Sequence, residues 1–233
     1  MSSVTFSLAS IPLYQEEILK FNGKDTNFKL IIANGKVVSV VSKQYKLIQS
    51  RLVFQEFLTS LPIEKIASIT LRTNLVKHYM YIRMSEMIEN YKLMLIAINS
   101  VDKSNALKLL SGIFVLDCGN DMIVMKGIYL KHIGKTLNIP EFENIIQATK
   151  GSLDFLKSSN VTLLDDDKKK ILGLVSKWGR YQMKEYLKSE KYNAFELYNK
   201  ITTHISKDYK INYFEKLQSL YNLIMTRIQE EEE

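Results

Sequence analysis

The pair Asn34-Gly35 lies between two short apolar runs, and it constrains the fold more than any other feature of the sequence. The two runs, 28–33 and 37–42, are rich in β-branched residues. Asn and Gly readily adopt the positive φ angles that a tight hairpin turn requires, so the pattern predicts an antiparallel hairpin. Antiparallel pairing is therefore the expectation for the strands around it.

The rest of the first 138 residues predicts further strands and one helix. Apolar residues recur at helical spacing from Ser50 to Leu61, and Pro62 is expected to end that helix. The stretch 45–48 is expected to be extended. Alternating or β-branched runs predict strands at 65–73, 76–84, 91–98, 113–118 and 123–129.

From Pro140 onward the periodicity becomes helical. Helices are predicted at 141–157, 168–178, 181–188, 194–205 and 213–229. The sequence therefore predicts the α+β class, with a twisted antiparallel sheet and one packed helix in residues 1–138. Residues 139–233 are expected to form a helical part that packs on this core, so that the chain forms one structural unit.

The composition argues against several classes of protein. The 233 residues are 46% hydrophobic, which is enough to bury a core. No apolar run approaches the roughly 18 residues of a membrane span, and residues 1–10 lack the pattern of a signal peptide. We expect a cytoplasmic protein, in the host cell if the chain is viral. The single cysteine, Cys118, is expected to be a small packed side chain.

The net charge of +7 permits an anionic partner. Residues 1–116 carry 14 Lys and Arg against 8 Asp and Glu, whereas residues 117–233 carry 18 against 17. The positive excess is thus in the first half of the chain. Heavy use of Lys, Asn and Ile would also follow from an AT-rich genome, so codon bias is an alternative explanation of the charge.

The sequence contains none of the common catalytic motifs, so we expect a protein that is not an enzyme. His78, His132 and His204 lie far apart in the sequence, and no Gly-rich phosphate loop or nucleophile elbow is found. A nucleophilic pair of Cys118 with His132 has nothing nearby to lower the thiol pKa. Asp165 to Asp167 are expected to begin a helix rather than to bind metal. We expect no metal and no cofactor.

A basic and aromatic strand face is the clearest candidate for binding. In 76–84, one side of the predicted strand carries Lys77, Tyr79, Tyr81 and Arg83. Bases stack on exposed aromatic rings while basic groups hold phosphates, so this face predicts a single-stranded nucleic acid as partner. Alternatively, the tyrosines pack against a helix and the basic side chains cover apolar surface. The candidate binding residues are Lys43, Tyr45, Lys46, Arg72, Lys77, Tyr79, Tyr81, Arg83, Lys103, Lys108, Lys131 and Lys135.

A resemblance to a known family rests on three parts of the chain. Residues 99–106 read Asn-Ser-Val-Asp-Lys-Ser-Asn-Ala, residues 112–122 place Cys118 before Gly-Asn-Asp-Met, and His132 follows. These segments, with 41–46 and 192–202, resemble the phage and plasmid protein family catalogued as domain of unknown function 932. Lys103 and Asp121 stand where that family often has glycine. Asn99 to Met122 is accordingly expected to be scaffold built from tight turns.

The resemblance implies work on DNA replication or recombination, because members of that family sit on mobile elements. A distant similarity to phage single-strand annealing recombinases, such as the phage lambda beta protein, points the same way. The leading hypothesis is a non-catalytic DNA-binding protein that prefers single strands, of DNA or RNA, and anneals or protects them. A homo-oligomer is plausible for such a protein. The alternatives are a protein-interaction or host-targeting module with a helical docking surface and, third, a metal-dependent nuclease using Asp117 with Asp121 or Asp165 to Asp167.

The lone tryptophan, Trp178, is assigned to the core of the helical part. A lone tryptophan on a helix is most often an anchor that packs against its neighbours. No binding role is therefore expected of it.

Overall fold

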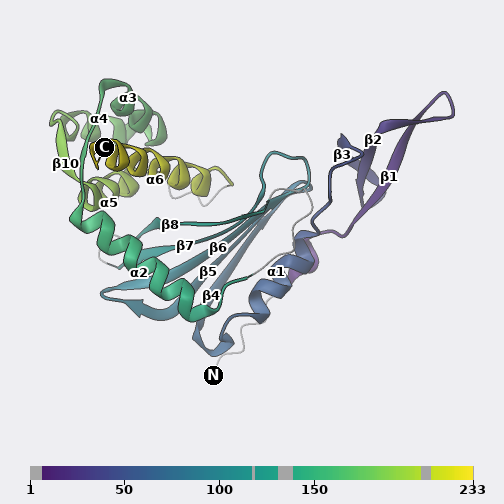
Figure 1. Ribbon diagram of the computed structural model, residues 1–233, viewed down its shortest axis with the longest axis horizontal. Helices are drawn as coiled ribbons and strands as arrows, with labels where there is room; N and C mark the ends of the chain where they lie inside the picture. Colours follow the sequence, from purple (N-terminus) through teal and green to yellow (C-terminus); the bar gives the residue numbers. More distant parts are fainter. Residues whose placement is uncertain (1–6, 117–118, 131–138, 206–210, 233) are drawn as a thin grey trace. The chain divides into compact units, whose positions relative to one another are not determined.

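The computed structural model describes residues 7–116, 119–130, 139–205 and 211–232, with strands in antiparallel sheets and a helical C-terminal end (Figure 1). The α+β class predicted from the sequence is confirmed. The strands are β1 (Tyr14–Phe21), β2 (Lys24–Ala33), β3 (Lys36–Ser42), β4 (Ile66–Thr73), β5 (Lys77–Ile88), β6 (Tyr91–Ser100), β7 (Leu107–Val115), β8 (Asn120–Leu130), β9 (Asn160–Thr162) and β10 (Lys191–Asn193). The helices are α1 (Ser50–Thr59), α2 (Phe142–Ser158), α3 (Asp165–Leu174), α4 (Lys177–Tyr186), α5 (Ala194–His204) and α6 (Ile211–Glu232).

Two Asn-Gly turns build the first sheet, which has the strand order β1-β2-β3. Asn34 and Gly35 have φ angles of 51° and 72°, which confirms the predicted hairpin between β2 and β3. Asn22 and Gly23 repeat the geometry, with φ angles of 49° and 74°, and join β1 to β2. Strand β1 was not predicted.

The second sheet has five strands in the order β4-β5-β6-β7-β8, and β4 pairs with β5 antiparallel. Consecutive strands are neighbours, as short connections favour. Lys77 to Met84 in β5 alternate as predicted, but both sides of this part of the strand are largely buried. When both faces of an inner strand are covered, the two sets of alternating side chains are both buried, and no solvent-exposed face remains.

Two compact units divide the chain, and each collects three segments of it. Unit 1 contains residues 1–85, 95–110 and 127–142, and unit 2 contains residues 86–94, 111–126 and 143–233. Strands β5 to β8 contribute residues to both units, so the units do not coincide with the two stretches divided at residue 138.

The core of unit 1 includes a cluster under the three-stranded sheet. Tyr14, Ile31 and Val41 of the sheet pack there with Tyr45 and Val101. Helix α1 is fixed at its first residue, because Asn99 Nδ2 donates to Ser50 Oγ at 2.9 Å. The helix ends before Pro62, as predicted.

Unit 2 is built mainly from helices. Helix α6 packs against α3 and α5, and α4 packs against α3 and α5. The predicted helix 168–178 is present as α3, but it ends at Leu174, and the next helix begins at Lys177 rather than at Tyr181, because the chain breaks at Val175 and Ser176. Helix α2 is joined to β7 by a buried hydrogen bond between the hydroxyls of Thr149 and Ser111. Among the helices that the structure describes, none is long and apolar enough to span a membrane.

Candidate nucleic-acid interface

Three loops of unit 1 meet and bring four lysines into one region. Residues 43–46 follow β3, residues 74–76 lead into β5, whose first residue is Lys77, and residues 101–105 follow β6. The Tyr45 hydroxyl donates to the Ser100 carbonyl at 3.3 Å, and Val101 N donates to the Val76 carbonyl at 2.9 Å. We call Lys43, Lys46, Lys77 and Lys103, which these loops carry, the basic loop cluster.

Local sequence explains why the loops hold this shape. Tyr45 is 6% exposed and anchors the first loop in the core, with Lys103 Nζ 5.9 Å from the centre of its ring. The Asn74 side chain accepts hydrogen bonds from N of Val76 and of Lys77, which forms the turn before β5. Each lysine is therefore carried by a loop whose backbone is fixed by specific hydrogen bonds or by a buried ring.

Two carboxylates act on this region: Glu16, which pairs with Lys29, and Asp102 of the 101–105 loop. Burial would raise the pKa of the Asp102 carboxyl, but hydrogen bonds from Ser104 and the charge of Lys77 lower it below its usual value. Asp102 Oδ1 accepts from Ser104 N at 3.0 Å, so the carboxylate is used to build the 101–105 turn. The basic loop cluster keeps a net positive charge.

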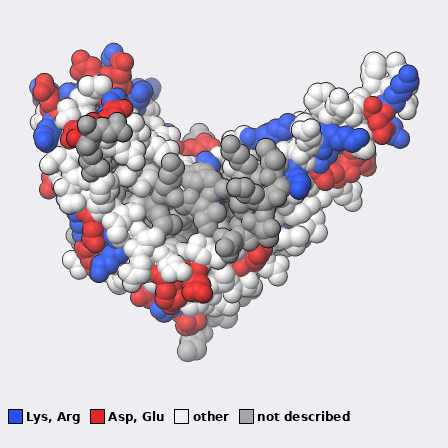
Figure 2. Space-filling view, in the orientation of Figure 1, with Lys and Arg blue, Asp and Glu red and all other residues white. Residues whose placement is uncertain are grey.

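The positive charge of the protein is concentrated in unit 1. Among the described residues, unit 1 has 13 Lys and Arg against 7 Asp and Glu, whereas unit 2 has 15 of each. Figure 2 shows basic side chains gathered over the three-stranded sheet, beside a smaller number of acidic ones. Summed charge of this kind attracts polyanions over distances of about a Debye length.

The predicted strand face forms, but its rings are not accessible. In the β4–β5 register Arg72 lies opposite Tyr79, and Thr70 lies opposite Tyr81, so these side chains share a face as expected. Tyr79 is 1% exposed and Tyr81 is 4% exposed. A ring that is fully covered cannot stack on a base, so the stacking role predicted for Tyr45, Tyr79 and Tyr81 is wrong. The alternative, in which the tyrosines pack against a helix, agrees with this burial.

The remaining candidates are distributed along the strands. Arg83 is half-buried, and its Nε donates to the Tyr81 hydroxyl at 2.9 Å. Arg72 is exposed on the edge strand β4, and Lys108 is half-buried on β7. Lys131 and Lys135 lie outside the described residues. Thus the structure brings Lys43, Tyr45, Lys46, Lys77 and Lys103 together, whereas Arg72, Tyr79, Tyr81, Arg83 and Lys108 lie along the strands outside that cluster.

The first part of the family-like segment serves as scaffold in unit 1. Asn99 is fully buried, and its Nδ2 donates to the Ile48 carbonyl as well as to Ser50. Ser100 and Asn105 exchange two hydrogen bonds that close the turn between β6 and β7. Lys103, at the position where the family often has glycine, has a φ of 67°. Its backbone is in the left-handed region that glycine favours.

The second part of that segment is fixed by helices of unit 2. Asn120 is buried, and its Nδ2 donates to Asn199 Oδ1 at 2.9 Å and also contacts the hydroxyl of Thr202 on α5. Asp121 is buried in β8 and accepts from the Tyr213 hydroxyl at 3.0 Å. The positive φ of this turn falls on Gly119, so Asp121 does not occupy a glycine-like backbone position. Cys118 and His132 lie outside the described residues.

Two of the three carboxylates at the start of α3 pair with basic side chains. Asp166 pairs with Lys169, and Asp167 pairs with Arg227. Asp117 lies outside the described part of the chain. Within that part, no group of three or more His, Cys, Asp or Glu side chains is placed to hold a metal ion.

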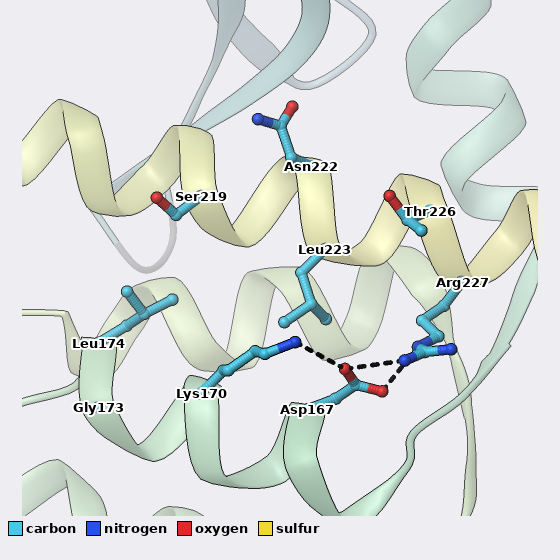
Figure 3. A pocket seen from close by; sticks show the side chains of 9 residues that line it. All are labelled: Asp167, Lys170, Gly173, Leu174, Ser219, Asn222, Leu223, Thr226 and Arg227. Atoms are coloured by element: carbon cyan, nitrogen blue, oxygen red, sulfur yellow. Dashed lines mark hydrogen bonds and ion pairs between the residues drawn. The ribbon is translucent and has the colours of Figure 1, made fainter.

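A groove of about 530 Å³ lies between α3 and α6, as Figure 3 shows. Asp167 is one of the residues that line it and is 1% exposed. Arg227 Nε donates to Asp167 Oδ2 at 2.7 Å, and Lys170 Nζ lies 3.8 Å from Asp167 Oδ1. Figure 3 shows both cations turned toward this carboxylate. Arg227 also pairs with Glu230, so two carboxylates face the two cations, and we assign the contact to holding the two helices together.

Sequence reasoning also missed exposed aromatic rings. The core position expected for Trp178 is wrong, because 71% of this residue is exposed on α4, and Tyr181 is 79% exposed. Gly179 and Met183 form the buried side of this helix instead. The signal that would have found this is the spacing of Gly179 and Met183, four residues apart, with Trp178 outside that line.

No family model, no curated protein and no solved structure matches this chain. The resemblance described above therefore stays a prediction.

Proposed function

We propose that the protein binds single-stranded DNA without catalysis and anneals or protects strands during replication or recombination of a virus or plasmid. The observation that carries this proposal is the convergence of Lys43, Lys46, Lys77 and Lys103 in the basic loop cluster. Four cations on loops pinned to a buried core form a surface that a polyanion can contact without rearranging the fold.

The lysines act as phosphate ligands. Each lysine that neutralises a phosphate releases a counterion, and for single strands the logarithm of the affinity falls by about 0.7 per contact for each tenfold rise in salt. Four contacts correspond to a slope of about −3. Such contacts carry no sequence information, so binding is expected to depend weakly on base sequence.

Charge reversal in the cluster tests the proposal. Binding of a fluorescein-labelled thymidine oligonucleotide is followed by anisotropy between about 50 and 300 mM salt, a range chosen because phosphate contacts weaken across it. Lys77→Glu with Lys103→Glu is expected to weaken binding at least about tenfold and to halve the salt slope. Lys150→Glu, on an exposed turn of α2, is the control for a charge reversal outside the cluster.

The proposal is overturned if the unmodified protein does not bind the oligonucleotide at low salt, or if the reversed variant binds as well as the Lys150→Glu control. Competition with duplex DNA and with RNA of the same length decides the preference for a single strand of DNA.

A protein-interaction module is the second candidate, and an apolar sheet face favours it. The register places Leu30 opposite Val40 and Ile32 opposite Val37, with Phe28 on the same side of β2. Phe28, Val37 and Val40 are each about half exposed. Contiguous exposed apolar side chains are typical of interaction sites. If this is the function, Val40→Lys loses a co-purified partner, whereas Lys77→Glu with Lys103→Glu keeps it.

A further inference from the structure

Helix α4 presents two aromatic rings on its outer side. Trp178 is 71% exposed and Tyr181 is 79% exposed, although large aromatic side chains dominate cores. The two residues are three positions apart, so they lie about 4.5 Å apart along the helix axis and on neighbouring parts of its surface.

The packing of α4 explains why these rings point outward. Ser176 caps the helix by accepting from Gly179 N at 3.1 Å. A Cβ on Gly179 would lie 2.8 Å from Cβ of His204, so only glycine allows α4 to approach the end of α5 this closely. Gly179 and Met183 therefore fill the buried side, and the Trp178 ring reaches only the edge of His204, with ring centres 6.3 Å apart.

The same outer side carries cations. Lys177, Arg180 and Lys184 are exposed, and among the described residues the structure has no ion pair for any of them. Glu185, the only acidic residue of α4, pairs with Lys188 at 2.6 Å. Three uncompensated positive charges thus surround the two exposed rings.

We propose that this face of α4, formed by Lys177, Trp178, Arg180, Tyr181 and Lys184, is a second contact surface for single-stranded DNA. Bases stack on the two rings, and the three cations contact the neighbouring phosphates. The proposal rests on the proposed function and adds to it the stacking surface that the buried tyrosines of unit 1 cannot provide.

Charge and shape favour a nucleic acid over a membrane surface as the occupant. A helix that lies on a membrane keeps a continuous apolar stripe free for the lipid. In α4 the small and apolar side, Gly179 and Met183, is buried against the protein, and the exposed rings are interspersed with charged and polar groups. Isolated rings flanked by cations match the alternation of bases and phosphates in a single strand.

Trp178 is the only tryptophan in the chain, so its fluorescence reports on this face alone. The full-length protein is titrated with unlabelled thymidine oligonucleotide. The expected result is saturable quenching of Trp178 at the same concentrations that give binding by anisotropy. Tyr181→Ala is expected to weaken binding about tenfold, as is usual for loss of one stacked base, and Trp178→Ala to do the same.

Matched variants separate stacking from other effects. Trp178→Phe keeps an aromatic face and is expected to retain most of the affinity, whereas Gln182→Ala changes an exposed polar residue of the same helix and is expected to bind normally. Normal DNA binding without Trp178 quenching, and without an effect of Tyr181→Ala, overturns this inference and leaves the proposed function standing.

Absence of any DNA binding overturns both proposals. Vesicles of phosphatidylcholine with phosphatidylserine are titrated in parallel. If they shift the Trp178 emission and DNA does not, the face binds lipid and the inference is wrong.

Discussion

The hydroxyl of Tyr14 lies 2.5 Å from Nε2 of His78, which joins β1 to the start of β5. The other ring nitrogen of His78, Nδ1, lies 2.6 Å from Oγ1 of Thr73. His78 is fully buried, so the imidazole is held between two hydroxyls without access to water. Strand β1 thus depends on a polar contact in the core as well as on its pairing with β2.

This arrangement predicts a loss of stability in mild acid. Burial lowers the pKa of His78 to about 4, below the usual 6.5. The unfolded chain takes up a proton below about pH 6.5 and the folded chain does not until about pH 4, so the free energy of unfolding falls across that window. The full effect is about 3 kcal/mol and is present above pH 6.5.

Urea unfolding from pH 7.5 to pH 4 measures this effect. His78→Gln has no proton to gain, so its free energy of unfolding is expected to lack this part of the decrease. Equal pH dependence in the two proteins would show that His78 does not contribute.

Replacement of Lys103 by glycine is expected to increase stability and to weaken binding, because the backbone of this residue is left-handed. Lys103 has a φ of 67°, and a side chain there costs about 1 kcal/mol relative to glycine. Lys103→Gly is therefore expected to raise the free energy of unfolding by up to about 1 kcal/mol and to weaken oligonucleotide binding. Lys103→Ala removes the same charge but keeps the strain, so it should weaken binding without gaining stability.

The tie between α3 and α6 predicts a large effect of one substitution. Arg227 donates two hydrogen bonds to Asp167, which is buried and also accepts from Leu164 N at the start of α3. Arg227→Leu removes both of these hydrogen bonds and leaves the carboxylate with only the more distant Lys170 as a charged neighbour, so it is expected to destabilise the protein by about 2 kcal/mol. Thermal unfolding measures the change. Lys169→Ala, which removes only the exposed pair with Asp166, serves as the control and should leave the melting temperature unchanged.

Replacement of glycine by alanine is expected to have opposite effects on stability at two positions, Gly112 and Gly151. A Cβ on Gly112 would lie 2.1 Å from the backbone oxygen of Met122, so Gly112→Ala forces β7 and β8 apart and is expected to cost about 3 kcal/mol or more. A Cβ on Gly151 meets nothing within 4 Å, and the residue is inside α2. Gly151→Ala is expected to stabilise by about 0.5–1 kcal/mol. A comparison of the two urea midpoints checks both.

The sequence predicted correctly those elements whose shape depends on one or two adjacent residues. The turn at Asn34-Gly35 needs only two adjacent residues, and Pro62 ends α1 by its own geometry, so both were found. Strand β1 was missed because Gln15, Glu16 and Glu17 break the alternation of apolar residues. Its pairing depends on the turn at Asn22-Gly23 and on the distant contact with His78.

The candidate site was harder to predict because exposure is decided by packing between distant segments. Alternation along β5 correctly placed Tyr79 and Tyr81 on one face, but no local pattern says whether that face is covered. Conversely, Trp178 has the composition of a core residue, and only the close approach of Gly179 to His204 turns it outward.

The alternation of segments between the two units also bears on how such a gene can change. The chain passes from one unit to the other five times between residues 85 and 143. An exchange of one unit for that of another gene by a single crossover would leave parts of the old unit behind. The two units are consequently expected to be inherited, duplicated and lost together as parts of one gene.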